Sequence, residues 1–170
     1  MVYRETYFDL ADLVNPSEKC LIICGAGISF NAPSNIPTAS EFIHTFLHLF
    51  LDKDILPKII SEPEIKFEKM IEIVHKSVDP MKKWFQYFDI IRDPNHFHFF
   101  IANHILHGNH VITMNFDYLI ELALIQSISN ENIEKIKPVI TKNDYTQHKN
   151  PYSSASKCYF PVFKFHGSLK

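Results

Sequence analysis

The stretch Lys19-Cys20-Leu21-Ile22-Ile23-Cys24-Gly25-Ala26-Gly27-Ile28-Ser29 begins as an apolar run and ends in a loop with two glycines. A short apolar run bounded by glycine is typical of a buried strand, so we predict a strand that ends just before the loop. Gly25 and Gly27 have no Cβ, which lets the chain turn tightly and present backbone N–H groups to a phosphate. Ser29 adds a hydroxyl donor. Taken alone, the loop fits a plain tight turn as well as a nucleotide loop, because Phe30 stands where the dinucleotide fingerprint has its third glycine.

Two further polar segments follow apolar runs in the same way. They are Thr113-Met114-Asn115-Phe116-Asp117 after His110-Val111-Ile112, and His166-Gly167-Ser168 after Val162-Phe163-Lys164-Phe165. Open α/β sheets bind ligands at the carboxyl ends of their strands, so we expect the three polar segments to meet at one edge of a sheet. Asn115 and Asp117 could both point into that crevice, or one of them could cap the following helix. His166 would stand at the rim, where an imidazole can accept a proton near neutral pH, although a single histidine is more often structural.

The stretch between the first two polar segments has the apolar spacing of helices rather than of strands. Thr38-Ala39-Ser40-Glu41 has the form of a capping box and predicts a helix start. Asp79-Pro80 and Asp93-Pro94 each place a carboxylate before a proline, which predicts two more helix starts. Gly108 is expected to end the last of these helices. Strands on both sides of a helical stretch indicate an α/β fold, and the polar residues 143–157 are predicted to form a surface loop.

Composition and charge exclude several classes of protein. The chain has 170 residues, of which 46% are hydrophobic and 21% are charged, which suits one domain with a sizeable core. A net charge of -2, without a basic run longer than a Lys-Lys pair, argues against direct binding of DNA or RNA. The apolar stretches are too short for a membrane span and the first residues lack a signal-peptide pattern, so we expect a cytoplasmic protein without membrane contact. Three cysteines cannot form a disulfide framework and fit a reducing compartment.

The order of the three polar segments carries a family resemblance. A glycine loop with Ile-Ser, then Thr-x-Asn-x-Asp, then His-Gly-Ser resembles the sirtuin-like family of NAD-consuming enzymes. The segment Asn35-Ile36-Pro37-Thr38-Ala39-Ser40-Glu41-Phe42 is similar to the variant of that family found in stand-alone prokaryotic-type proteins. The resemblance implies a Rossmann-like parallel sheet with a helical insertion at about 38–108. Because the family's sheet continues beyond its His-Gly, we expect residues 1–170 to be a partial domain, incomplete at the C-terminus, with an unpaired sheet edge at Phe163 to Phe165 that would favour self-association.

The resemblance also implies roles for individual residues. The NAD phosphates and the adjoining ribose would be held by Gly25, Ala26, Gly27 and Ser29. Asn115 would position the nicotinamide ribose or an attacking water, and Asp117 would read the nicotinamide carboxamide. His166 would be the general base that acts on a ribose hydroxyl. NAD is then the substrate, and Asn115 and His166 are the expected catalytic residues.

Departures from the deacylase pattern of the family favour water as the acceptor. Met114 stands where deacylases usually have glutamine, and Thr38-Ala39-Ser40 replaces the Asp-Phe-Arg that often follows Ile-Pro. The paired Cys-x-x-Cys zinc module is missing, since Cys20 and Cys24 fall on one strand and Cys158 is alone, so we predict no zinc. The favoured function is hydrolysis of NAD to nicotinamide and ADP-ribose, which in such relatives implies NAD depletion as an antiviral defence effector.

The sequence leaves open two alternative functions and a candidate metal site. The chain could be a non-catalytic module that binds NAD or ADP-ribose and signals to a fused or partner domain, or it could be an NAD-dependent protein deacylase. A homo-oligomer is a further expectation. The histidines near one helix could in principle hold a metal, but no acidic or cysteine ligand falls at matching spacing, so ordinary core and rim histidines are favoured. These histidines are His96, His98, His104, His107 and His110.

Overall fold

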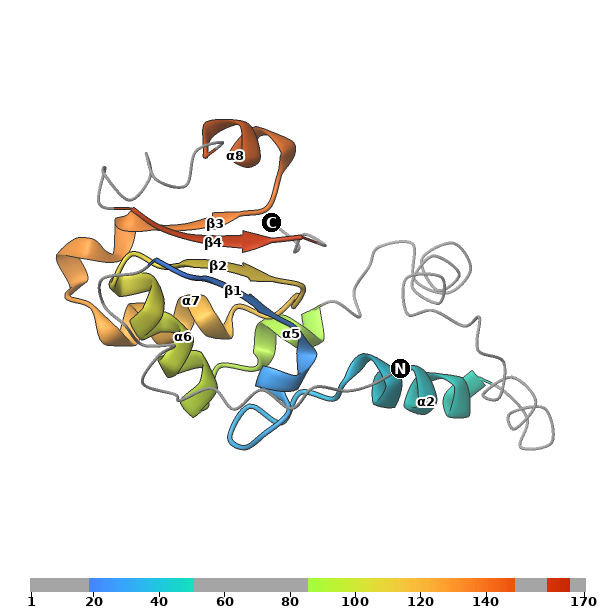
Figure 1. Cartoon of the computed structure of the whole chain (residues 1–170). Helices are drawn as coiled ribbons and strands as arrows, with labels where there is room; N and C mark the ends of the chain where they lie inside the picture. The colour runs from blue at the N-terminus through green and yellow to red at the C-terminus, as the bar shows by residue number, and fades with distance from the viewer. Residues whose placement is uncertain (1–18, 51–85, 149–158, 166–170) are drawn as a thin grey trace, which may run out of the picture.

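The computed structural model describes residues 19–50, 86–148 and 159–165, and its framework is a parallel sheet with helices (Figure 1). Among these residues the strands are β1 (Leu21–Cys24), β2 (His110–Thr113), β3 (Ile136–Val139) and β4 (Phe160–Lys164). The helices are α2 (Ala39–Phe50), α5 (Gln86–Ile90), α6 (His96–Leu106), α7 (Leu119–Ser127) and α8 (Lys142–Gln147), with 3-10 segments η1 (Ala26–Ser29) and η3 (Asn130–Lys135). All strand pairs are parallel, in the order β1-β2-β4-β3. The expected Rossmann-like α/β class is confirmed.

The position of β4 corrects one expectation from the sequence. β4 lies between β2 and β3, so Phe163 pairs with Ile112 on one side and with Val139 on the other. The prediction of an unpaired edge at Phe163 to Phe165 is therefore wrong, because a strand that sequence analysis did not recognise covers that side. β3 itself contains Pro138, which cannot donate to a ladder and is tolerated on an edge strand.

β1 is less buried than its apolar sequence predicts. It pairs with β2 in the sheet order, and its side chains alternate between the two faces. Ile22 and Cys24 pack against the core, whereas Leu21 and Ile23 are 56% and 63% exposed. The strand at 21–24 is confirmed, but only one of its faces is covered.

The core lies between one face of the sheet and the helices α6 and α7, which lie together on that side (Figure 1). Its buried residues are Ile101, Ala102, Ile105, Val111, Ile120, Ala123, Leu124 and Val162. Side chains alternate along a strand, so Phe163 points to the opposite face, where its ring lies 6.1 Å from that of Tyr145 in α8. By the same alternation Lys164 returns to the α7 side of the sheet.

The helix starts are partly as predicted. The capping box of α2 is confirmed, because the Thr38 N–H donates to Glu41 Oε2 at 2.9 Å and the Glu41 N–H donates to Thr38 Oγ1 at 3.4 Å. The start of α6 differs, since the N-cap is Asn95 and not Asp93. The His98 side chain reaches back to the Asn95 N–H and completes a capping box that a carboxylate two residues earlier could not form.

The end of α6 agrees with the sequence prediction, whereas the start of α8 does not. Gly108 ends the α6 region with φ of 81°, as predicted. The loop predicted at 143–157 is wrong in its first part, because α8 occupies Lys142–Gln147 behind a capping box at Thr141. Asp79-Pro80 and the whole segment 51–85 between α2 and α5 lie outside the described residues. No helix in the described part of the chain has the length and apolar character needed to cross a bilayer.

Candidate functional site

A cavity of about 250 Å³ lies at the carboxyl ends of β1 and β2. Its walls are mainly apolar, and its lining includes Gly25, Ala26, Ile36, Phe42, Phe88, Met114 and Phe116. Its polar side chains come from Asn115 and Asp117, on the loop that follows β2. The structure therefore brings the first two polar segments together at one edge of the sheet, where parallel sheets bind ligands.

The glycine loop leaves room in front of its backbone. Gly25 has φ of -138°, an extended conformation that any residue adopts, so the turn itself does not require glycine there. A Cβ built on Gly25 or on Gly27 would have no atom within 4 Å. The chain then enters η1 at once, with the Ile28 N–H donating to the Gly25 carbonyl at 3.1 Å. Open space in front of two glycines fits a loop that a ligand approaches closely better than it fits a plain tight turn.

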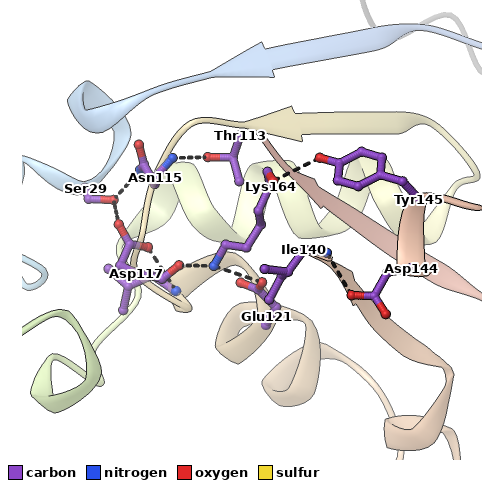
Figure 2. Close-up of polar contacts among 10 residues, drawn as sticks. Ser29, Thr113, Asn115, Asp117, Glu121, Ile140, Asp144, Tyr145 and Lys164 are labelled. Carbon is purple, nitrogen blue, oxygen red and sulfur yellow. Dashed lines mark hydrogen bonds and ion pairs between the residues drawn. The ribbon is translucent and has the colours of Figure 1, made fainter. Parts of the chain in front are cut away.

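Ser29 is the centre of a buried hydrogen-bond network. Its Oγ donates to Asp117 Oδ2 at 3.0 Å and accepts from Asn115 Nδ2 at 3.0 Å (Figure 2). A third contact joins Ser29 Oγ to His98 Nε2 at 3.0 Å. The side chain of Ser29 is fully buried, so its hydroxyl serves this network and is not a free donor for a phosphate.

The hydrogen bonds of His98 indicate which tautomer its neutral ring adopts. The Asn95 N–H donates to His98 Nδ1 at 3.0 Å, so the proton of the neutral ring is on Nε2, which donates to Ser29 Oγ. An Nε2 that already carries a proton cannot take one from the serine. Burial lowers the pKa of His98, more than the nearby Asp117 carboxylate raises it. The pair is therefore a structural contact between α6 and the glycine loop and not a serine nucleophile with its base.

Asp117 both lines the cavity and contacts the start of the following helix. Its Oδ1 accepts from the Leu119 N–H at 3.1 Å at the start of α7, whose N-cap residue is Tyr118, while Asp117 also lines the cavity. Asn115 lines the cavity too, and its N–H donates to Thr113 Oγ1 at 3.1 Å. Both residues are buried, so their polar groups depend on partners within the protein.

A buried ion pair between Lys164 and Glu121, not predicted from the sequence, contacts this loop. Lys164 is 1% exposed, and its Nζ lies 3.2 Å from Glu121 Oε1 (Figure 2). The same ammonium donates to the carbonyl of Asp117 and lies 3.9 Å from the centre of the Tyr118 ring. Burial raises the pKa of Glu121, an effect larger than the lowering by Lys164. Tyr145 Oη in turn donates to the Lys164 carbonyl at 2.9 Å.

A signal for this pair was present in the sequence. Glu121 is the charged residue of the apolar run Leu119-Ile120-Glu121-Leu122-Ala123-Leu124-Ile125, and Lys164 is the charged residue of Phe160-Pro161-Val162-Phe163-Lys164-Phe165. Single opposite charges in two otherwise apolar runs indicate a buried ion pair, since charged side chains are rarely buried unless paired. Asn95 and His98 gave no comparable signal, because their roles depend on contacts with the distant residues 28–31.

The structure does not describe the predicted base, whereas it does allow a search for metal ligands among the described residues. His166 lies outside the described residues, two positions after the end of β4. In the described ranges 19–50, 86–148 and 159–165, no group of three His, Cys, Asp or Glu side chains could hold a metal ion. The thiol of Cys24 donates to the Ile112 carbonyl at 3.6 Å, and burial raises its pKa, which disfavours the thiolate that binds metals.

Comparison of the chain with protein-family models, with curated proteins and with solved structures finds no match. The case for a function therefore rests on the geometry of the cavity and on the motifs that line it.

Proposed function

We propose that this protein hydrolyses NAD at the bond between nicotinamide and ribose, releasing nicotinamide and ADP-ribose. The observation that carries the proposal is the apolar cavity closed at one side by Asn115 and Asp117. At about 250 Å³ it is smaller than the roughly 300–1,000 Å³ of pockets that hold a whole drug-sized ligand, so it suits one end of a dinucleotide. A flat pyridine ring with one polar substituent matches walls that are apolar apart from two polar side chains.

Asp117 can still recognise a carboxamide although it holds its own loop. An ionised carboxylate has about four lone-pair positions, and the described contacts with Ser29 and with the Leu119 N–H use two of them. An amide N–H₂ group in the cavity could therefore donate to a further position. The rest of the dinucleotide would leave the cavity past Gly25 and Gly27, where the backbone faces open space.

The reaction places few demands on the protein. Water attacks the ribose carbon, the carbon–nitrogen bond breaks, and the electron pair of that bond returns to the pyridine nitrogen, so nicotinamide leaves as a neutral molecule. The water proton must be accepted, and the resemblance assigns proton management to His166. This chain's residues contribute by orienting the ring and excluding bulk water, which the buried Asn115 and Asp117 and the apolar walls support.

The test is release of nicotinamide from NAD by the wild-type protein and by three variants. His166→Ala should lose about 10²–10⁴-fold in turnover, the usual contribution of a general base. Asn115→Ala should also lose activity, whereas the matched control Asn143→Ala, exposed on α8, should not. The assay uses residues 1–170.

Three results would contradict the proposal or redirect it. Saturable binding of NAD without any release would favour the non-catalytic binding module. Release that requires an acylated lysine peptide would favour the deacylase. Release that is unchanged in both His166→Ala and Asn115→Ala would place the reaction elsewhere.

A further inference from the structure

We infer that Lys164 is a positioning residue, whose ammonium holds the Asp117 carbonyl and thereby aims Asn115 and Asp117 at the cavity. The inference deepens the proposed function, and its activity readout rests on that function. Its other readout, the mobility of the loop, does not.

Burial of the Lys164 and Glu121 charges has a desolvation cost. Lys164 is 1% exposed and Glu121 is 5% exposed, so both charges are removed from water. A buried ion pair is often no more stabilising than a pair of apolar side chains of the same volume. Stability alone therefore does not explain a lysine at this point of an apolar strand. A methionine could fill the same space, but it could not donate a hydrogen bond.

The Lys164 ammonium reaches a carbonyl at the start of α7, that of Asp117. The helical hydrogen bonds of α7 begin with the Leu122 N–H and the Tyr118 carbonyl, so the Asp117 carbonyl comes before the helical ladder. Asp117 is 4% exposed, and a buried carbonyl needs a donor. Lys164 Nζ is that donor (Figure 2).

Asp117 is held through both its side chain and its main chain. Its Oδ1 accepts from the Leu119 N–H, its Oδ2 accepts from Ser29 Oγ, and its carbonyl accepts from Lys164. The side-chain contacts come from the start of α7 and from the glycine loop, whereas the main-chain contact comes from β4. Since Asn115 also donates to Ser29, a shift of Asp117 would move both cavity residues together.

The lysine is itself fixed at both ends. Its ammonium is placed by Glu121 and the Tyr118 ring, and its carbonyl accepts from Tyr145 Oη at 2.9 Å. A donor held in this way can set the position of the loop rather than follow it.

The decisive variant is Lys164→Met with Glu121→Leu, which removes both charges and keeps apolar volume. The matched control is Lys137→Met, because Lys137 lies on the neighbouring strand β3 and its ammonium is also above a tyrosine ring, that of Tyr159 at 5.5 Å. Urea unfolding first establishes that the double variant is folded. Hydrogen exchange then follows the amides of Asn115 and Leu119, whose hydrogen bonds join the loop to the end of β2 and to the start of α7.

We expect these two amides to exchange about tenfold faster or more in the double variant, as for loss of one hydrogen bond to a charged group. The amides of β2 should not change, and nicotinamide release should fall by a similar factor. Unchanged exchange at Asn115 and Leu119 in a folded double variant would overturn the inference. If the wild-type protein releases no nicotinamide, the proposed function fails, and the exchange rates still decide the role of Lys164.

A second variant keeps the inference testable if the double variant does not fold. Glu121→Gln removes the counter-charge but leaves the lysine able to donate to Asp117. We expect loop exchange to stay near the wild-type rate. Exchange about tenfold faster in Glu121→Gln would show that the ion pair, and not the bond to Asp117, sets the loop, and would overturn the inference.

Discussion

Two buried polar groups hold the loop 114–118 from different sides, and they differ in how their charge is distributed. The first, which we call the Ser29 network, joins Ser29, Asn95, His98 and the side chains of Asn115 and Asp117 through several hydrogen bonds. The second, the Lys164 pair, consists of Lys164 and Glu121 and reaches the loop through the Asp117 carbonyl.

The difference between them concerns what a single change leaves behind. In the Ser29 network the Ser29 hydroxyl contacts the side chains of His98, Asn115 and Asp117, and each of these side chains loses only one contact when the hydroxyl is removed. In the Lys164 pair each charge depends mainly on the other, and removal of one leaves an uncompensated charge in the core. We therefore expect a single substitution to cost less unfolding free energy in the Ser29 network than in the Lys164 pair.

The largest effect should come from breaking the Lys164 pair at one residue. Lys164→Met leaves the Glu121 carboxylate buried and unpaired, which we expect to cost about 3–5 kcal/mol of unfolding free energy. The free energy is measured by urea unfolding at pH 8. At pH 5 the loss should be smaller, because burial already raises the pKa of Glu121, and protonation below the raised pKa removes the buried charge. A loss below that of the control Lys137→Met would contradict the comparison.

Ser29→Ala should have the next largest effect. Removal of the hydroxyl leaves the Nδ2 of Asn115 and the Nε2 of His98 without this acceptor, and we expect a loss of about 1–3 kcal/mol. The exposed Ser40→Ala on α2 is the matched control and should be nearly neutral. Equal losses in Ser29→Ala and Lys164→Met, measured by the same unfolding curves, would remove the distinction between the two groups.

The Ser29 network should also respond to acid through His98. Its pKa in the folded protein is lowered from the ordinary 6.5 by burial, so the unfolded chain binds the proton first. The contribution of His98 to stability is present above pH 6.5 and is lost as the pH falls through the lowered pKa. His98→Gln keeps a donor toward Ser29 but does not titrate, so its unfolding free energy should fall less than that of the wild type between pH 7.5 and pH 5. Parallel pH curves for the two proteins would show that His98 does not report on the network.

The smallest effect is expected at Tyr145, which hydrogen-bonds the Lys164 carbonyl. Tyr145→Phe removes the hydroxyl that donates to the Lys164 carbonyl, at a cost of about 0.5–1.5 kcal/mol. Thermal unfolding measures it. If this loss reached that of Lys164→Met, the end of β4 and not the buried charge would be the critical support.

Local patterns made some of the fold predictable. The strands at 21–24 and 110–113 and the start of α2 at Thr38 were recognisable because an apolar run, a glycine or a capping box lies within a few residues. β3 was not recognisable, since Lys137 and Pro138 interrupt its short apolar pattern. The N-cap of α6 was misplaced because the choice between Asp93 and Asn95 depends on the side chain of His98.

Some residues of the candidate site could be predicted from the sequence and others could not. Gly25, Asn115 and Asp117 could be placed together because the carboxyl ends of neighbouring parallel strands meet at one edge. The inward orientation of the Ser29 hydroxyl could not be predicted, since its partners lie on α6 and on the loop after β2. The contact of Lys164 with Asp117 likewise depends on the insertion of β4 beside β2, which no local pattern specifies.

The insertion of β4 between β2 and β3 has a consequence for the growing chain. When a ribosome has released β1, β2 and β3 but not β4, the sheet lacks a central strand, and the facing edges of β2 and β3 have no partner in the sheet. Such edges pair readily with other chains, so we expect the nascent protein to be most prone to aggregate at this stage. The same strand brings Lys164 to the Asp117 carbonyl, so we expect the cavity to take its final shape only when the sheet closes.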